Sequence, residues 1–275
     1  MTYRELRAEL RAVGVSDDET EARLLFRHEL GENYFAAVAE DRDVPSPFFS
    51  RAVEERRKHR PLQYILGLWP FYKEIYEVKE GCLIPRPDTE ILVETAVREL
   101  PEHCFFADLC AGSGCVGISV LASRPDTRCV GVDIAPDLVD LCMRNASRNG
   151  VSDRYEARTF DVLGEDIRAL FEGKDGPTCL LSNPPYIPTR VIPTLSYEVQ
   201  KEPKLALDGG EDGLVFYKRL IRLCRDCLRP GNLAMFEIGY DQGRALLELS
   251  RNAGFDCEII KDLSDLDRVA KTRIR

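Results

Sequence analysis

The sequence predicts an α/β fold: a seven-stranded, mostly parallel sheet with helices on both faces, preceded by a small all-helical domain. Residues 1 to about 62 carry only helical patterns, whereas strand and helix patterns alternate from residue 104 onward. Such alternation is typical of parallel sheets with crossover helices. Only a short polar stretch separates the last two strand patterns. We therefore expect the final strand to be antiparallel.

The first 62 residues contain several helix signals. Leu6 and Leu10 recur at helical spacing, and Ser16-Asp17-Asp18-Glu19 has the pattern of a capping box. This box is expected to open the helical run Ala22 to Leu30. Pro45-Ser46-Pro47 then breaks the chain before a further helix that carries the basic run Arg56–Arg60. That run is either a solvated helix end or a docking surface for a partner.

The middle of the chain predicts a change of domain. Turn residues flank Phe71, Ile75, Tyr76 and Val78, which indicates a short hairpin. An apolar helix over Ile91 to Leu100 follows. The expected division is a helical docking domain at 1–66, a hairpin linker at 67–84 and a catalytic domain at 85–275. Seven strands are expected in the last part, at Cys104–Leu109, Arg128–Asp133, Tyr155–Thr159, Cys179–Ser182, Asn232–Ile238, Cys257–Ile260 and Arg268–Arg273.

Composition narrows the class of protein. The chain has 275 residues and a net charge of −9, with 44% hydrophobic and 31% charged residues. The acidic balance argues against a duplex-DNA binder, which needs many cations. No apolar run approaches the ~18 residues of a membrane span, and no signal peptide precedes the first helix, so we expect a cytoplasmic protein. The ten cysteines are expected to be buried free thiols, and Cys224 and Cys227 alone do not predict a metal site.

Polar and glycine residues end three of the expected strands. Asp108-Leu109-Cys110-Ala111-Gly112-Ser113-Gly114 closes the first strand, where glycines let backbone amides approach a ligand. Asp133 ends the next strand, where a carboxylate can accept both hydroxyl protons of a ribose. Asp161 and Val162 follow the third strand, in position for an adenine edge. Gly112 to Gly117 also satisfies G-x-G-x-x-G, so this loop alone leaves a nicotinamide dehydrogenase open.

The fourth strand runs into Asn183-Pro184-Pro185-Tyr186, which favours a different chemistry. An amide nitrogen is a poor nucleophile, because its lone pair is delocalised, so a catalyst must orient its NH₂ group. The Asn183 side-chain oxygen and the Pro184 carbonyl can accept its two protons, and neither proline offers a competing N–H. The Tyr186 ring can stack on the flat amide. These residues are the candidate catalytic and substrate-binding groups.

Together these motifs resemble class I methyltransferases that act on exocyclic or amide nitrogen, and more specifically the HemK/PrmC family. The resemblance extends to Arg60–Gly67, Leu83–Glu90, Glu202–Leu214, Phe236–Gly239, Lys261–Leu263 and Asp267–Val269. It implies a Rossmann-like methyltransferase domain and methylation of the glutamine in the Gly-Gly-Gln motif of class 1 peptide chain release factors. S-adenosyl-L-methionine is the implied cofactor. Its expected contacts are Asp108, Cys110, Ala111, Gly112, Ser113, Gly114, Asp133, Asp161, Val162 and Asn183.

Two departures from the family pattern and two alternative functions remain. The family often has glycine at Cys110 and a larger residue at Val162. An adenine-N6 methyltransferase on DNA or RNA would use Asn-Pro-Pro-Tyr equally well, but it needs a basic groove. A non-catalytic binding module is a further alternative. We expect a monomer whose partner is the release factor, without direct nucleic-acid contact, membrane attachment or metal.

Overall fold

The computed structural model describes residues 1–171 and 176–275. The chain forms two compact units. The first, which we call the helical unit, comprises Met1–Leu68 and Ser196–Lys201. The second, the sheet unit, comprises Trp69–Leu195 and Glu202–Arg275. The helical unit therefore includes a short segment, Ser196–Lys201, that is inserted in the sequence of the sheet unit.

Side-chain caps begin the main helices of the helical unit. Thr2 and Glu5 form a capping box at α1, and Ser46 caps α4 with Pro47 in its first turn. The expected box at Ser16 is wrong: α2 begins at Asp18, and the cap is Asp17, which accepts from the Thr20 N–H at 3.1 Å. The elements of this unit are α1 Tyr3–Ala12, α2 Asp18–Leu30, η1 Gly31–Asn33, α3 Tyr34–Ala39, α4 Pro47–Arg57, α5 Leu62–Leu66 and η5 Val199–Lys201.

An aromatic core and one buried cation hold this unit together. Phe26 and Phe49 stack with their ring centroids 4.7 Å apart. Arg56 is only 4% exposed; its guanidinium pairs with Glu21 at 2.7 Å and with Glu198. Neither expectation for the run Arg56–Arg60 therefore holds at Arg56, because this side chain is buried in an ion pair rather than solvated or displayed to a partner.

The sheet has seven strands in the order β5-β4-β3-β6-β7-β9-β8. β5, β4, β3, β6 and β7 are parallel, and β9 runs antiparallel to both of its neighbours. The seven-stranded, mostly parallel sheet and the antiparallel last strand are both confirmed, and each expected strand lies within a residue of the observed one. The strands are β3 Phe105–Leu109, β4 Arg128–Asp133, β5 Tyr155–Thr159, β6 Cys179–Ser182, β7 Leu233–Glu237, β8 Asp256–Lys261 and β9 Asp267–Arg273.

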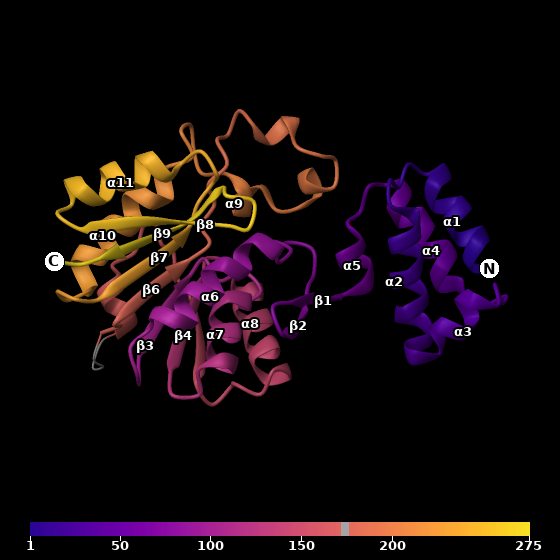
Figure 1. Ribbon diagram of the computed structural model, residues 1–275, viewed down its shortest axis with the longest axis horizontal. Helices are drawn as coiled ribbons and strands as arrows, with labels where there is room; N and C mark the ends of the chain where they lie inside the picture. The colour runs from indigo at the N-terminus through magenta and orange to yellow at the C-terminus, as the bar shows by residue number, and fades with distance from the viewer. Residues whose placement is uncertain (172–175) are drawn as a thin grey trace. The chain divides into compact units, whose positions relative to one another are not determined.

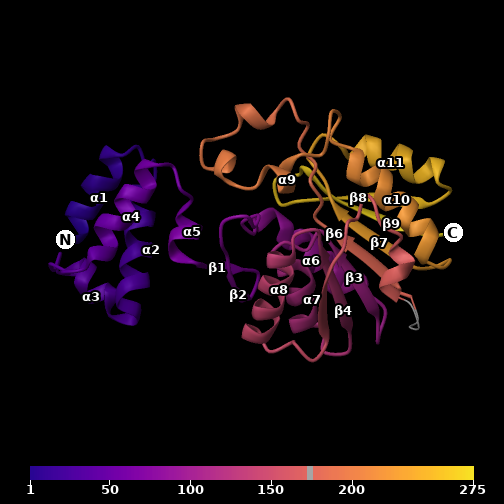
Figure 2. The same ribbon diagram turned by 180° about the vertical axis from the view of Figure 1, so that it is seen from behind.

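Helices cover both faces of this sheet. Successive residues of a strand point to opposite sides, so apolar strand residues give each face side chains that a helix can cover. Phe106 packs on one face beneath α6, α7 and α8, and Ala107 packs on the other beneath α10 and α11. Figures 1 and 2 show these two layers. The remaining elements of the sheet unit are η2 Pro87–Thr89, α6 Glu90–Glu99, α7 Cys115–Ser123, α8 Pro136–Arg148, η3 Ile167–Phe171, η4 Ile192–Thr194, α9 Lys204–Leu207, α10 Val215–Cys227 and α11 Gly243–Asn252.

The direction in which strands are added reverses between β3 and β6, in the interior of the sheet. From β3 the chain moves to β4 and β5 on one side, and then returns to β6 on the other side. Ligands of open α/β sheets bind at the carboxyl ends of strands at such a switch point. The predicted hairpin is also present, as β1 Leu68–Phe71 and β2 Glu74–Glu77. Among the described helices, none is long and apolar enough to cross a membrane.

Candidate active site

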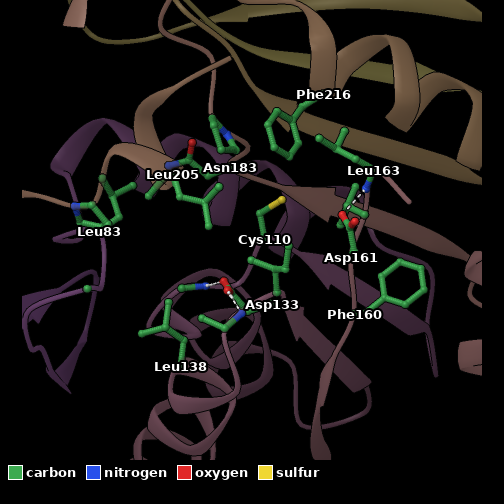
Figure 3. A pocket seen from close by; sticks show the side chains of 18 residues that line it. Leu83, Cys110, Asp133, Leu138, Phe160, Asp161, Leu163, Asn183, Leu205 and Phe216 are labelled. Carbon is green, nitrogen blue, oxygen red and sulfur yellow. Dashed lines mark hydrogen bonds between the residues drawn. The ribbon is translucent and has the colours of Figure 1, made fainter. Parts of the chain in front are cut away.

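A pocket opens at the carboxyl ends of β3, β4, β5 and β6, with about 790 Å³ of empty space that includes solvent at its mouth. Figure 3 shows its walls. The predicted site residues that line it are Cys110, Gly112, Asp133, Asp161, Val162, Asn183 and Pro185. Asp108, Ala111, Ser113, Gly114, Pro184 and Tyr186 are not among its lining residues.

The loop after β3 needs unusual backbone geometry. Gly112 and Gly114 have φ values of +58° and +79°, in the left-handed region that glycine occupies without cost. A Cβ at Gly114 would also lie 2.8 Å from Ile118 Cδ1. Cys110 adopts φ +60° as well, a conformation that is costly for a residue with a Cβ. A glycine at this position would avoid that strain.

Asp133 is fixed at the floor of the pocket. Its Oδ2 accepts from the Gly112 N–H at 2.9 Å, and its Oδ1 accepts from the Ala135 N–H at 3.0 Å (Figure 3). Burial raises the pKa of this carboxyl, and the two backbone donors oppose that rise. Each oxygen keeps lone pairs after these contacts. Asp133 can therefore accept further hydrogen bonds from hydroxyl groups in the pocket without moving.

Asp108 supports the loop from below. It is 1% exposed, and its Oδ2 accepts from the Gly117 N–H at 2.9 Å. Burial raises the pKa of Asp108 to about 7, and the nearby Asp133 adds to the rise. This carboxyl therefore holds the first turn of α7 against β3, outside the pocket walls.

The far wall of the pocket is apolar. Asp161 accepts from the Leu163 N–H at 2.8 Å, which tightens the turn after β5, and Arg219 Nε donates to the Val162 carbonyl at 2.9 Å. Sequence reasoning missed other apolar side chains of the walls, which are Leu83, Ile134, Leu138, Leu163, Leu205 and Phe216. Ile134 and Leu163 adjoin predicted residues, and the others come from segments farther away along the chain. A flat aromatic group fits between such apolar side chains better than a charged one does.

Asn183 stands at the carboxyl end of β6. The preceding Ser182 hydroxyl donates to the Leu109 carbonyl at 2.6 Å and ties this strand end to β3. The Asn183 Nδ2 group donates to Thr89 Oγ1 at 3.1 Å. Since the amide NH₂ points to Thr89, the side-chain carbonyl oxygen points away from it. The carbonyl oxygen of the same amide is then available to accept a hydrogen bond from another group.

Tyr186 is anchored at both ends. Gln242 Nε2 donates to its backbone carbonyl at 3.0 Å, and its hydroxyl donates to Glu237 Oε1 at 3.3 Å. Burial and the neighbouring Glu237 raise the pKa of the Tyr186 hydroxyl, so it stays protonated at neutral pH. Sequence reasoning assigned a role only to the ring and missed this hydroxyl contact.

Glu237 lies behind the Asn183–Tyr186 turn, at the end of β7, and is 1% exposed. Burial raises its pKa to about 7, while Thr89, Arg268 and Tyr186 act against the rise. Thr89 and Glu237 were not predicted as site residues. The available signal was an acidic residue ending an apolar strand, in Phe236-Glu237-Ile238-Gly239, because such a group requires buried partners.

These features define a class I methyltransferase: a seven-stranded sheet with a glycine loop after β3, an aspartate after β4 and Asn-Pro-Pro-Tyr after β6. The family model "Methyltransferase small domain" matches residues 87–211, and "PrmC N-terminal domain" matches residues 2–67. A ribosomal protein L11 methylase from Lactobacillus delbrueckii subsp. bulgaricus shares the fold. Its TM-score is 0.51 at 16% identity, over 75% of this chain and 90% of that one.

Curated relatives define the family more narrowly. A release factor glutamine methyltransferase from Geobacter sulfurreducens is 38% identical over 81% of this chain and 76% of its own. One from Caulobacter vibrioides is 39% identical over 79% and 74%. The chain belongs to the release factor glutamine methyltransferase family, and it is an enzyme.

Proposed function

We propose that this protein transfers a methyl group from S-adenosyl-L-methionine to the side-chain amide nitrogen, N5, of the glutamine in the Gly-Gly-Gln motif of class 1 release factors. One observation carries the proposal. The Asn183-Pro184-Pro185-Tyr186 turn lies at the carboxyl end of β6, and Asn183 and Pro185 line the same pocket as Asp133. The names of the relatives support the choice of glutamine and release factor.

The pocket suits a nucleoside that ends in a sulfonium. The Asp133 carboxylate, held by two backbone donors, would accept the ribose hydroxyl protons. The apolar wall around Phe160, Val162 and Phe216 would cover the adenine, and Asp161 would lie at its edge. S-adenosylmethionine would supply an activated methyl group there. These contacts follow from the donors and acceptors that line the pocket.

The turn after β6 would handle the acceptor amide. The Asn183 Oδ1 and Pro184 carbonyl oxygens would each accept one proton of the glutamine NH₂ group and stabilise the positive charge that develops on nitrogen. Orientation is the larger contribution, because an amide must present its nitrogen in line with the bond that breaks. The Tyr186 ring, anchored through Glu237 and Gln242, would keep the amide flat against the turn.

We assign substrate docking to the N-terminal region, within the three-part division 1–66, 67–84 and 85–275. The burial of Arg56 removes it from that surface, so other side chains of the helical unit must contact the release factor. A substrate that works on the ribosome would place the enzyme in the cytoplasm. We further propose that it acts as a monomer, without direct nucleic-acid contact.

Labelled methyl transfer tests this function. The protein would be incubated with labelled S-adenosylmethionine and, in parallel, with release factor, release factor whose Gly-Gly-Gln glutamine is replaced by alanine, DNA and RNA. We expect label only in the unmodified release factor. Label in DNA or RNA alone would support the adenine-N6 alternative and reject the proposal. Label in the alanine-substituted factor would show that the glutamine has been misassigned.

A further inference from the structure

We propose that Asn145 is a positioning residue of the cofactor site, because its side-chain amide ties the loop Gly112–Gly114 to the second hairpin strand, β2. The inference rests on the proposed function, in which this loop and Asp133 hold S-adenosylmethionine. It adds a residue of α8 that lies outside the motifs from which the site was predicted. It also gives the hairpin, which the sequence predicts only as a linker, a part in supporting the cofactor site.

The loop after β3 needs support from outside its own backbone. Gly112 and Gly114 both have positive φ values, and glycine has a wide choice of conformations. The Ser113 peptide lies between them, so the direction of its carbonyl depends on hydrogen bonds more than on side-chain sterics. The Gly112 N–H donates to Asp133 Oδ2 at 2.9 Å. A change at Ser113 would therefore reach the carboxylate that is proposed to hold the ribose.

Asn145 supplies the hydrogen bond to this carbonyl. The residue is fully buried, and its Nδ2 donates to the Ser113 carbonyl at 2.9 Å. The same Nδ2 donates to the Glu77 carbonyl at 3.0 Å, and Oδ1 accepts from the Glu77 N–H at 2.7 Å. Strand β2, which contains Glu77, lies beside α8 in both ribbon views (Figures 1 and 2). One side-chain amide thus joins the loop to β2.

The three partners leave the Asn145 amide a single orientation. Two of them are carbonyl oxygens, which only accept, and the third is a backbone N–H, which only donates. A rotated amide would place its oxygen against two carbonyls and its NH₂ group against an N–H. Removal of the Asn145 side chain leaves the Ser113 carbonyl without this donor, and an unsatisfied buried acceptor costs free energy.

Strand β2 is also fixed to the helix that follows the loop, α7. Tyr76 is fully buried, and its hydroxyl lies 2.6 Å from Ser119 Oγ. The Ser119 hydroxyl donates its own proton to Glu74 Oε2 at 2.7 Å, so Tyr76 is the donor toward Ser119. Through Asn145 and Ser119, β2 therefore holds both the loop and the helix that begins at its end.

Calorimetry of cofactor binding tests the role of Asn145. Asn145→Ala should raise the Kd for S-adenosylmethionine by about ten-fold, the scale of one buried acceptor that loses its donor. Asn149→Ala is the matched control. Asn149 lies one turn further along α8, and its Nδ2 donates to the carbonyls of Ile75 and Asn145. Because these bonds do not involve the loop, the control should change the Kd by less than about two-fold.

Two further readouts separate positioning from a general loss of structure. In Asn145→Ala the KM for S-adenosylmethionine should rise by about ten-fold, whereas kcat at saturating cofactor should stay within about three-fold of wild type, since the Asn183 turn is unchanged. The Gly112 amide proton is bonded to Asp133. Without cofactor, it should exchange with solvent at least several-fold faster in Asn145→Ala than in Asn149→Ala.

Tyr76→Phe tests the contribution of β2 and keeps the buried ring. It removes the hydroxyl that donates to Ser119. The Kd for S-adenosylmethionine should therefore rise by about three-fold, and exchange of the Gly112 amide should accelerate as it does in Asn145→Ala. Urea unfolding measured alongside shows whether each variant is folded. Unchanged affinity together with unchanged exchange in folded Tyr76→Phe would overturn the role assigned to β2.

Two results would overturn the role of Asn145. Folded Asn145→Ala with a Kd within about two-fold of wild type would show that the Ser113 contact does not support the site. Equal losses of affinity in Asn145→Ala and Asn149→Ala would show a general effect of α8 instead of the contact with the loop. A wild-type protein that binds no S-adenosylmethionine, while its Gly112 exchange responds to Asn145→Ala, would reject the proposed function and leave the contact standing.

Discussion

Asp133 has the most clearly assigned single role at the site. Its carboxylate already accepts from Gly112 and Ala135, and we propose that it also accepts from the ribose hydroxyls of the cofactor. Asp133→Ala should weaken S-adenosylmethionine binding by about 1.5–3 kcal/mol, the scale of a hydrogen bond to a charged group. Asp133→Asn, which keeps one acceptor, should lose less. Isothermal calorimetry measures both, and unchanged affinity in Asp133→Ala would mean that the cofactor lies elsewhere.

Two variants of Tyr186 distinguish the contribution of its ring from that of its hydroxyl. Tyr186→Ala removes the surface against which the amide is held and should lower kcat by about 100-fold. Tyr186→Phe keeps the ring but takes a donor from the buried Glu237; this should cost about 1 kcal/mol, or several-fold in rate. Steady-state kinetics on release factor gives both numbers. Equal losses in the two variants would show that the hydroxyl, and not the ring, is what matters.

Most of the site residues were predicted from short, contiguous sequence motifs. Gly112, Asp133, Asp161 and Asn183 line one pocket, as expected, because each ends a strand and parallel strands end at the same edge. Thr89, Phe216 and Glu237 could not be predicted in this way. Their positions depend on how α6, α10 and β7 pack against the turn, and no local pattern in the sequence encodes that packing.

At the scale of elements, the segment Ser196–Lys201 shows what local patterns miss. Strand positions followed from apolar runs bounded by turns. The burial of Arg56 did not, because its partner Glu198 lies 142 residues away. The sequence therefore predicted that the basic run Arg56–Arg60 lies at the surface. This segment follows the Asn183 turn in the chain and yet belongs to the helical unit.

Arg56 yields a prediction about the stability of that unit. Arg56→Ala leaves the partly buried Glu21 without its cation, and burial already raises the pKa of Glu21. Removing one partner of a buried pair typically costs about 3–5 kcal/mol. Arg57→Ala is the control, since Arg57 is exposed and pairs only weakly with Glu54 at 3.5 Å; it should cost less than about 0.5 kcal/mol. Urea unfolding of the full chain measures the difference, and similar losses would contradict a structural role for Arg56.

At the scale of the whole molecule, buried carboxyls make stability depend on pH. The pKa of Asp108 rises from 3.8 to about 7 on folding, mainly through burial. The folded state therefore binds this proton more tightly, so the group's contribution is favourable at low pH and is lost as pH rises from about 4 to 7. The stability of the wild type relative to Asp108→Asn should fall by about 2–4 kcal/mol over that window.

The pKa of Asp126 shifts in the opposite direction to that of Asp108. Arg124 and the His103 N–H lower the pKa of its carboxyl. The stability it contributes is therefore present above the unfolded pKa and is lost as pH falls. The free energy of unfolding in urea would be measured between pH 3 and 8, about once per pH unit. The difference between wild type and Asp108→Asn should fall as pH rises, whereas the difference between wild type and Asp126→Asn should increase. Parallel slopes would contradict the assigned environments.

We have proposed that the turn at Asn183 positions a glutamine amide of the release factor for methylation. The most direct test is a tandem mass spectrum of the Gly-Gly-Gln peptide after reaction with the wild-type protein or with Asn183→Ala. We predict one added methyl group, located on the glutamine side chain, with the wild type. Folded, cofactor-binding Asn183→Ala should form it about 100- to 1000-fold more slowly. A methyl group on another residue, or wild-type rates in that variant, would contradict the account.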